Sequence, residues 1–145
     1  MAVQRIDNTA IVFEDLDAAV AFFTALGLEM EGRQFVEGQF VDDCVGIPNV
    51  RSEIAMMRAP SAVGGRLELT RYHRPDAIPA APPAPNTVGF HRVMFAVEDL
   101  DGVLERLRKH GVELLGTVAQ YENIYRLCYV RGPEGIVVAL AEEIG

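Results

Sequence analysis

The chain has 145 residues, of which half are hydrophobic and 23% are charged, enough apolar material for the core of one domain. Its 13 Lys and Arg against 21 Asp and Glu give a formal net charge of −8. This balance excludes a general nucleic-acid-binding protein and gives no attraction to anionic lipid.

The compartment follows from segments that the sequence lacks. No uninterrupted apolar stretch follows the first residues, and no apolar run is long enough to span a bilayer, so we expect a cytoplasmic protein without a membrane partner. Cys44 and Cys128 lie far apart without CxxC spacing, and we expect two buried free thiols.

The first half of the chain predicts one strand, one helix and three further strands. Residues 6–13 are rich in β-branched side chains and predict a strand. Asp15 is a suitable N-cap for the apolar residues at helical spacing that follow, and Gly27 is expected to end that helix. Turn residues then separate three predicted strands, at 29–36, 51–58 and 66–72.

The second half repeats this pattern. The segment VFEDLD at residues 12–17 aligns with AVEDLD at residues 96–101, which predicts two copies of one supersecondary unit. A strand at 93–97, a helix cap at Asp99 and a helix stop at Gly111 are expected in this copy. Three strands follow, at 112–121, 125–131 and 136–142.

A connector separates the two copies. We predict a first βαβββ module at 1–72, a connector at 73–89 and a second βαβββ module at 90–145. The connector holds five of the eight prolines and is expected to be extended: Pro75, Pro79, Pro82, Pro83 and Pro85.

Two βαβββ modules with a strand–EDLD–helix opening resemble the vicinal oxygen chelate (VOC) superfamily of glyoxalase I, bleomycin resistance proteins and extradiol dioxygenases. The resemblance rests on NTAIVFEDLDAAVAFFTALGLEMEG, GRLELTRY, RVMFAVEDLD and YVRGPEGIVVALAE. It implies an α+β fold whose modules pair into an open, curved mixed sheet around a cavity, and it implies a homodimer. The activity stays open, because function lies in the site rather than in the fold.

The resemblance also implies where a divalent metal would be bound. Enzymes of this family hold the ion with one side chain from the first strand and one from the last strand of each module, and the register of the EDL and LEL segments places the four positions at Asn8, Glu68, Arg92 and Ala139. Only Glu68 is a good ligand, and the permanent cation of Arg92 repels a divalent ion. We therefore expect a degenerate metal site and predict no cofactor.

His91 lies one residue before the metal position of the second module. Side chains alternate across a strand, so we expect His91 on the opposite face from Arg92 and not as a ligand. His73, at the start of the connector, is likewise not expected to bind metal.

Three functions remain open for such a site. The first is a binding protein that sequesters a hydrophobic or aromatic small molecule, as in antibiotic resistance, with Asn8, Glu68 and Arg92 joined by an apolar wall. In it, Glu68 and Arg92 either hold the modules together as an ion pair, or Arg92 donates to a carbonyl, carboxylate or phenolate of the ligand. The wall is expected to comprise Ile54, Met56, Met94, Phe95, Tyr125 and Tyr129.

The second function is a metal-independent lyase or isomerase of natural-product metabolism. Glu68 is its best catalytic candidate, with Tyr125 or Glu122 as the second group. A metal-dependent lyase or dioxygenase ranks last.

Overall fold

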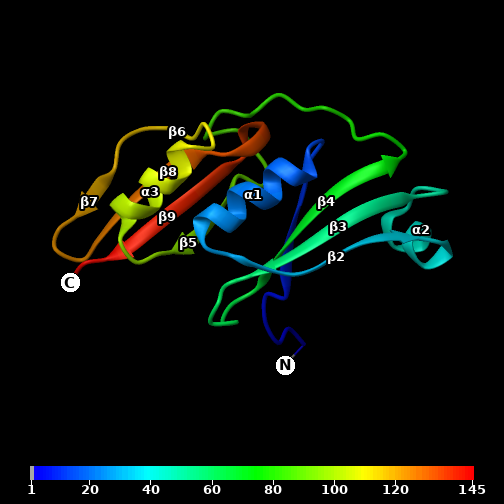
Figure 1. Ribbon diagram of the computed structural model, residues 1–145, viewed down its shortest axis with the longest axis horizontal. Coiled ribbons are helices and arrows are strands. Elements are labelled where there is room, and N and C mark those ends of the chain that lie inside the picture. Colours follow the sequence, from blue (N-terminus) through cyan, green and yellow to red (C-terminus); the bar gives the residue numbers. More distant parts are fainter. Residues whose placement is uncertain (1) are drawn as a thin grey trace. The chain divides into compact units, whose positions relative to one another are not determined.

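The structure is a computed structural model that describes residues 2–145 (Figure 1). The chain forms two compact units, Met1–Pro79 and Ala80–Gly145, and the division between them falls inside the predicted connector. Each unit contains its own β-sheet with a helix packed on one face, a mixed α+β architecture as predicted.

The first unit is built on a four-stranded sheet in the order β1-β4-β3-β2. The first and last strands of the unit lie side by side and run parallel, while the two remaining strand pairs are antiparallel. The strands are β1 (Asn8–Val12), β2 (Glu29–Glu37), β3 (Arg51–Arg58) and β4 (Arg66–Arg74). β4 therefore includes His73 and Arg74, the first two residues of the predicted connector.

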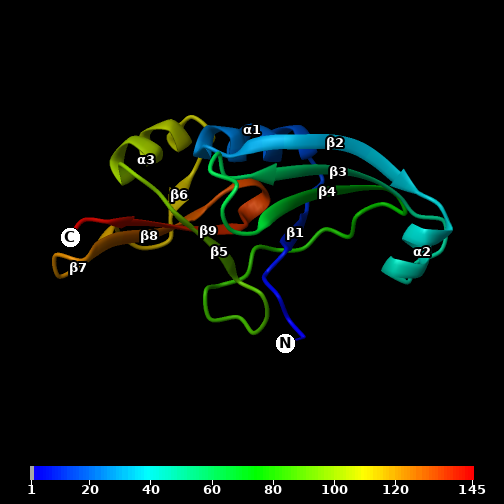
Figure 2. The same ribbon diagram turned by 90° about the horizontal axis from the view of Figure 1, so that it is seen from below.

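Helix α1 (Leu16–Leu26) lies along one face of this sheet (Figure 2). Its predicted ends are confirmed: the Asp15 side chain accepts a hydrogen bond from the Ala18 amide, and Gly27 follows the helix with φ +123°. The helix packs its apolar stripe against the sheet, burying Leu16, Ala19, Phe22, Phe23 and Leu26.

A second, short helix in this unit, α2 (Gln39–Val45), was not predicted from the sequence. Its apolar residues Phe40, Val41, Cys44 and Val45 do recur at helical spacing, but the segment is only seven residues long and none of its residues is buried. It lies between Gly38 and Gly46, whose positive φ angles of 113° and 80° turn the chain into and out of the helix.

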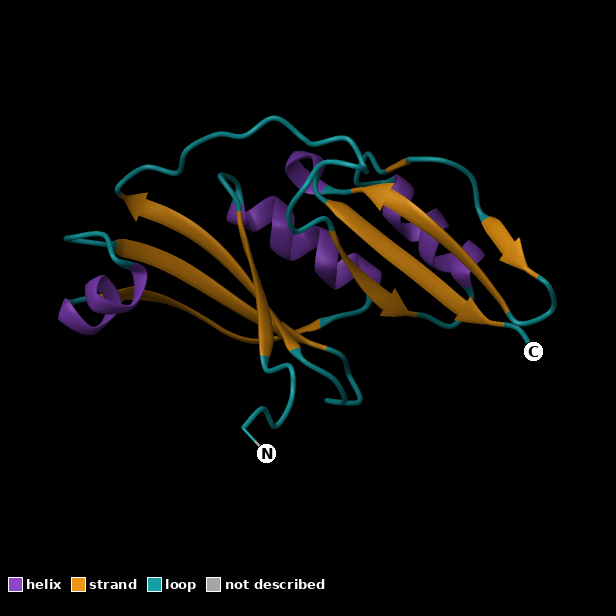
Figure 3. Ribbon diagram, turned by 180° about the vertical axis from the view of Figure 1, so that it is seen from behind, coloured by secondary structure: helices purple, strands orange, loops and turns teal. Residues whose placement is uncertain are grey.

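The second unit repeats the arrangement with the sheet order β5-β9-β8-β6 and a short strand β7 that pairs with β8 (Figure 3). Its first and last strands are again adjacent and parallel. The elements are β5 (Arg92–Ala96), α3 (Leu100–Arg108), β6 (Glu113–Leu114), β7 (Ala119–Tyr121), β8 (Tyr125–Arg131), a 3-10 turn η1 (Pro133–Gly135) and β9 (Val137–Glu143).

Two expectations for this unit need correction. The strand predicted at 112–121 is divided into β6 and β7, with Gly116 in the break. The helix ends at Arg108 with Lys109 as its C-cap, so Gly111, at φ +72°, lies in the following turn rather than at the cap itself.

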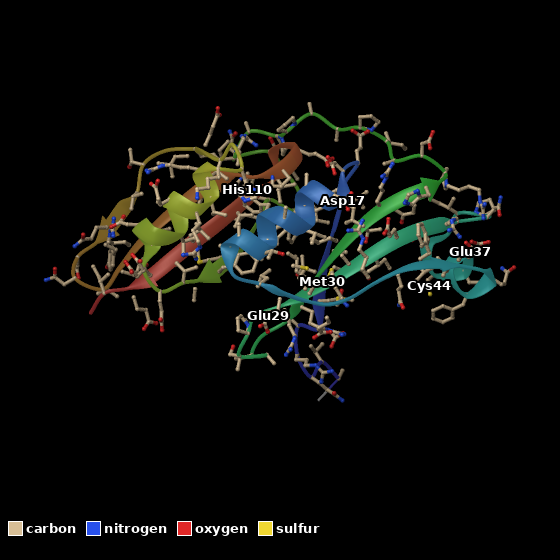
Figure 4. The ribbon with its side chains drawn as sticks, in the orientation of Figure 1. Asp17, Glu29, Met30, Glu37, Cys44 and His110 are labelled. Carbon is tan, nitrogen blue, oxygen red and sulfur yellow. The ribbon has the colours of Figure 1, made fainter. Side chains whose placement is uncertain are left out.

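The two cysteines have different surroundings. Cys128 is buried in β8, where burial raises the pKa of its thiol, whereas Cys44 is exposed on α2 (Figure 4). The prediction of two buried thiols was therefore wrong for Cys44, although both are free. Among the described residues, no helix has the length and apolar character needed to cross a bilayer.

Candidate functional site

Each sheet has one face toward its helix and one face away from it, which we call the distal face. On β4, Leu67 and Leu69 are buried under α1, so alternation places Glu68 and Thr70 on the distal face. The register of the sheet adds side chains from the other strands to the distal face of the first unit: Asn8, Ala10, Val12, Ser52, Ile54 and Met56.

Glu68 occupies the middle of this distal face, half-buried between Ala10 of β1 and Met56 of β3. Its carboxylate accepts a 3.4 Å hydrogen bond from the Thr70 hydroxyl. No Arg, Lys or His of residues 2–79 lies within ion-pair distance of it. Within its own unit, Glu68 is therefore a carboxylate without a counter-charge. Thr70 was not predicted as a site residue, although its position two residues after Glu68 on the same strand is the signal that places it there.

On the second sheet, Val138 and Leu140 are buried toward α3 and pair with Val93 and Phe95 of β5. Phe95 consequently lies on the helix side and does not belong to the predicted apolar wall, because neighbouring residues of a strand point to opposite faces. The distal face of this sheet carries Arg92, Met94, Ala96, Tyr125, Leu127, Tyr129, Val137, Ala139 and Ala141.

Arg92 lies over the ring of Tyr129 on this distal face. The guanidinium carbon lies 4.4 Å from the centre of the Tyr129 ring, a cation–π contact that stabilises by about 0.5–1 kcal/mol at an exposed site. No carboxylate of residues 80–145 lies within ion-pair distance of Arg92. Most of its N–H donors are therefore without an acceptor in its own unit.

His91 lies beside these two residues. Its ring centre is 6.4 Å from that of Tyr129, and its Nδ1 is 3.1 Å from the Arg92 Nη1. His91 precedes the first residue of β5, so strand alternation does not apply to it, and the prediction that it points away from Arg92 was wrong. A guanidinium only donates, so Nδ1 accepts and the proton is on Nε2, which is buried without a partner among the described residues.

The family positions are equivalent in the two units. Asn8 pairs with Arg66, two residues before Glu68, and Arg92 pairs with Val137, two residues before Ala139. The first-strand and last-strand positions are therefore diagonal neighbours on the distal face of each parallel pair. Within each unit, no three His, Cys, Asp or Glu among the described residues gather where they could hold a metal ion.

The predicted wall residues Met94 and Tyr125 are open to solvent, at 51% and 36% exposure. Tyr125 stacks on Tyr121 of β7 with ring centres 5.6 Å apart. Ile54 and Met56 are half-buried on the other sheet. Apart from Phe95, the predicted wall residues thus lie on a distal face, in two sets divided between the units.

His73 takes part in a charged cluster on the other side of the first sheet. Arg33 bridges Asp17 of α1 (Figure 4) and Glu53 of β3, both at 2.8 Å, and His73 lies 3.3 Å from Glu53. The hydrogen bond from Arg33 is the main cause that lowers the pKa of Glu53, and His73 adds to it. This cluster ties α1 to the sheet.

Comparison with known proteins identifies the family. The model of the glyoxalase/bleomycin resistance protein/dioxygenase superfamily matches residues 7–129. A glyoxalase family protein from Bacillus cereus is 48% identical in sequence, and the match covers 100% of this chain and 99% of that one with a TM-score of 0.94.

More distant solved structures share the fold alone. The trypanothione-dependent glyoxalase I of Leishmania major is 20% identical, covering 97% of this chain and 88% of that one with a TM-score of 0.65. TioX from Micromonospora is 16% identical, covering 97% and 99% with a TM-score of 0.60. No curated protein matches the sequence. Two βαβββ units, the family-model match and the B. cereus relative together establish that the chain belongs to the glyoxalase/bleomycin resistance protein/dioxygenase superfamily.

Proposed function

We propose that this protein binds a hydrophobic or aromatic small molecule through the distal faces of its two sheets, without a metal ion, as a sequestering or resistance protein does. The observation that carries the proposal is Arg92, a guanidinium fixed on an aromatic ring at a family metal position and without a carboxylate partner in its own unit.

The donor set at the four family positions does not fit a divalent metal. Glu68 offers a carboxylate and Asn8 only a weak amide oxygen, while Ala139 has no donor atom. Arg92 would repel the ion, because two positive charges a few ångströms apart cost several kcal/mol wherever the effective dielectric constant is below that of water. The metal chemistry of the family therefore has no place in the proposed mechanism.

Arg92 instead suits an oxygen atom of the ligand. A guanidinium has five N–H donors in a planar fork, and its contact with the Tyr129 ring holds that plane in place. A carbonyl, carboxylate or phenolate oxygen would accept from it, and an aromatic part of the same molecule would contact Tyr125, Met94 or Met56. If Glu68 forms an ion pair with Arg92, the N–H groups of Arg92 that Glu68 does not occupy are still available to the ligand.

Metal analysis is the first test. The protein is purified without chelator, and its zinc, nickel, manganese and iron contents are measured by elemental mass spectrometry. We expect far less than one ion per chain and no thermal stabilisation by added metal. One ion per chain would refute the metal-free site.

Ligand binding is the second test. Thermal-shift titrations with 1-naphthoate, 2-naphthol and naphthalene-1-carboxamide should raise the melting temperature, because a ligand that binds the folded state stabilises it. Arg92→Ala should weaken the binding of naphthoate by about tenfold, or 1.4 kcal/mol. Tyr129→Ala should also weaken it, whereas Arg108→Ala, on an exposed turn of α3, should leave binding unchanged.

Naphthoate binding that is equal in Arg92→Ala and in the wild type would place the ligand elsewhere. The proposed binding function would be contradicted if the melting temperature rises with none of the three compounds and with none of a wider set of aromatic natural products.

A second candidate, a metal-independent lyase or isomerase, is favoured by one observation. Glu68 is a half-buried carboxylate that receives only the 3.4 Å hydrogen bond from Thr70 within its own unit, which suits a general base. Exchange of an acidic C–H of a bound compound into deuterated water, followed by NMR, would test it. If Glu68→Gln loses the exchange but still binds the compound, Glu68 is the catalytic base. If the wild type shows no exchange, the protein binds without catalysing this reaction.

A further inference from the structure

A pocket of about 230 Å³ lies at one end of the first sheet, and Glu68 is not among its lining residues. Its lining residues come from the segment before β1, from the β3–β4 hairpin at residues 59–65 with the strand ends that flank it, and from Glu31 of β2. Figure 1 shows these segments at the end of the sheet near the N-terminus. The site proposed above uses none of these residues.

Three arginines from separate segments converge on this pocket. Arg5 precedes β1, Arg58 is the last residue of β3, and Arg66 is the first residue of β4. Gly65 lets the segments approach closely, because a Cβ at this position would lie 3.1 Å from the Ile6 carbonyl oxygen. Arg66 joins them further, since its amide donates to the Asp7 carbonyl.

Two carboxylates complete the pocket lining, Asp7 and Glu31. The strand register shifts between Met30 and Gly32, so Glu31 is the extra residue of a β-bulge that directs its side chain toward Arg58 and Arg66. Glu29 lies next to it at the start of β2 (Figure 4).

The arginines are only partly satisfied by these carboxylates. The Arg58 nitrogens lie 3.7 Å from the nearest oxygens of Glu29 and Glu31, too far for hydrogen bonds. Arg66 donates a 3.4 Å hydrogen bond from Nη1 to Glu31, and its Nη2 lies 3.6 Å from Asp7. Only Arg5 has a close pair, at 3.1 Å from Asp7.

Backbone donors are also free at the hairpin. No described residue accepts a hydrogen bond from the amide of Gly64 or Gly65, and both glycines line the pocket. Ala62 and Gly64 have positive φ angles of 57° and 87°, whereas Val63 and Gly65 do not, so left-handed and other backbone conformations alternate along the hairpin. Successive amides in such backbone can form a concave donor surface for an anion.

The pocket lining carries three arginines and two carboxylates, and Glu29 lies beside Arg58 just outside the lining. Each guanidinium has five N–H donors, more than the neighbouring carboxylates occupy, and the hairpin adds backbone amides; both kinds of donor bind phosphate oxygens in proteins. We infer that this pocket is a binding site for a phosphate group, held by Arg58, Arg66 and the Gly64–Gly65 amides.

The test titrates inorganic phosphate into the full chain labelled with ¹⁵N, at constant ionic strength, with acetate as a parallel arm for a carboxylate ligand. We expect saturable shifts of the Gly64 and Gly65 amide signals with phosphate. Arg58→Ala and Arg66→Ala should each weaken phosphate binding by about tenfold, and Arg108→Ala is the matched control on α3. Saturation by acetate at lower concentration than phosphate would overturn the phosphate assignment in favour of a carboxylate.

The variant Glu31→Gln distinguishes a phosphate-binding site from an ion network that only stabilises the fold. Removal of this carboxylate takes away repulsion and frees Arg58 and Arg66, so phosphate should bind more tightly than in the wild type. A purely structural ion network predicts no gain. Linear, non-saturating shifts, or affinities that are the same in all four variants, would overturn the inference.

Discussion

At the scale of single residues, the charged side chains Arg33 and Glu53 connect separate elements of the first unit. Arg33 lies between Asp17 and Glu53, and it connects helix α1 to strand β3 across the face of the sheet. Glu53 also contacts His73 at the far end of β4, so one carboxylate joins groups from three elements. Surface ion pairs contribute little on average, but networks with partly buried members contribute more.

A pH prediction follows from Glu53. Because its pKa is lowered in the folded protein, its stabilising contribution is complete above the ordinary glutamate pKa of about 4.3 and is lost as the pH falls below that value. Urea unfolding should therefore show the wild type more stable than Glu53→Gln at pH 7, and the difference should shrink at pH 3. A difference that stays constant between the two pH values would contradict this role.

At the scale of elements, the short helix α2 illustrates a segment held by polar contacts instead of a core. The Asp42 carboxylate accepts hydrogen bonds from the amides of Asn49 and Val50, both at 2.8 Å. Asn49 has a φ of +60°, and Val50 is 1% exposed at the entry to β3. Asp42 therefore fixes the turn that leads from α2 into the core.

We predict that Asp42→Ala lowers the free energy of unfolding by about 1–3 kcal/mol, because it removes two charge-assisted hydrogen bonds to the backbone. Chemical denaturation measures the change. Asp43→Ala is the matched control: among the described residues, Asp43 accepts a hydrogen bond only from the exposed Gln39 side chain, and we expect a change below about 0.5 kcal/mol. Equal effects of the two substitutions would rule out a special role for Asp42.

At the scale of the whole molecule, the two units carry different charges at the positions where the family resemblance implies metal ligands. The first unit keeps an anionic side chain, Glu68, on its distal face, and the second unit has a cationic one, Arg92. Each lacks a counter-charge within its own unit. That Glu68 and Arg92 are neighbours stays a prediction from the family resemblance. A homodimer, which light scattering would test, is a second such prediction.

A double-mutant cycle tests the neighbourhood of the two charges. If they pair, Glu68→Ala and Arg92→Ala should be non-additive in unfolding free energy by more than about 0.5 kcal/mol. Glu68→Ala combined with Arg108→Ala should be additive. Additivity in both cycles would mean that Glu68 and Arg92 do not interact.

The sequence by itself determined the two-module α+β fold, because strand alternation, the Asp caps and the repeated EDLD segment are local signals. It located β3 and β8 to the residue, since turn residues bound both strands. It missed α2, which has no buried stripe, and it misplaced His91, which lies just before β5. It also misplaced Phe95, which strand alternation puts on the opposite face from Met94. The Arg92–Tyr129 contact and the arginine pocket were decided only by tertiary structure, because strand pairing and a β-bulge bring together residues far apart in the chain.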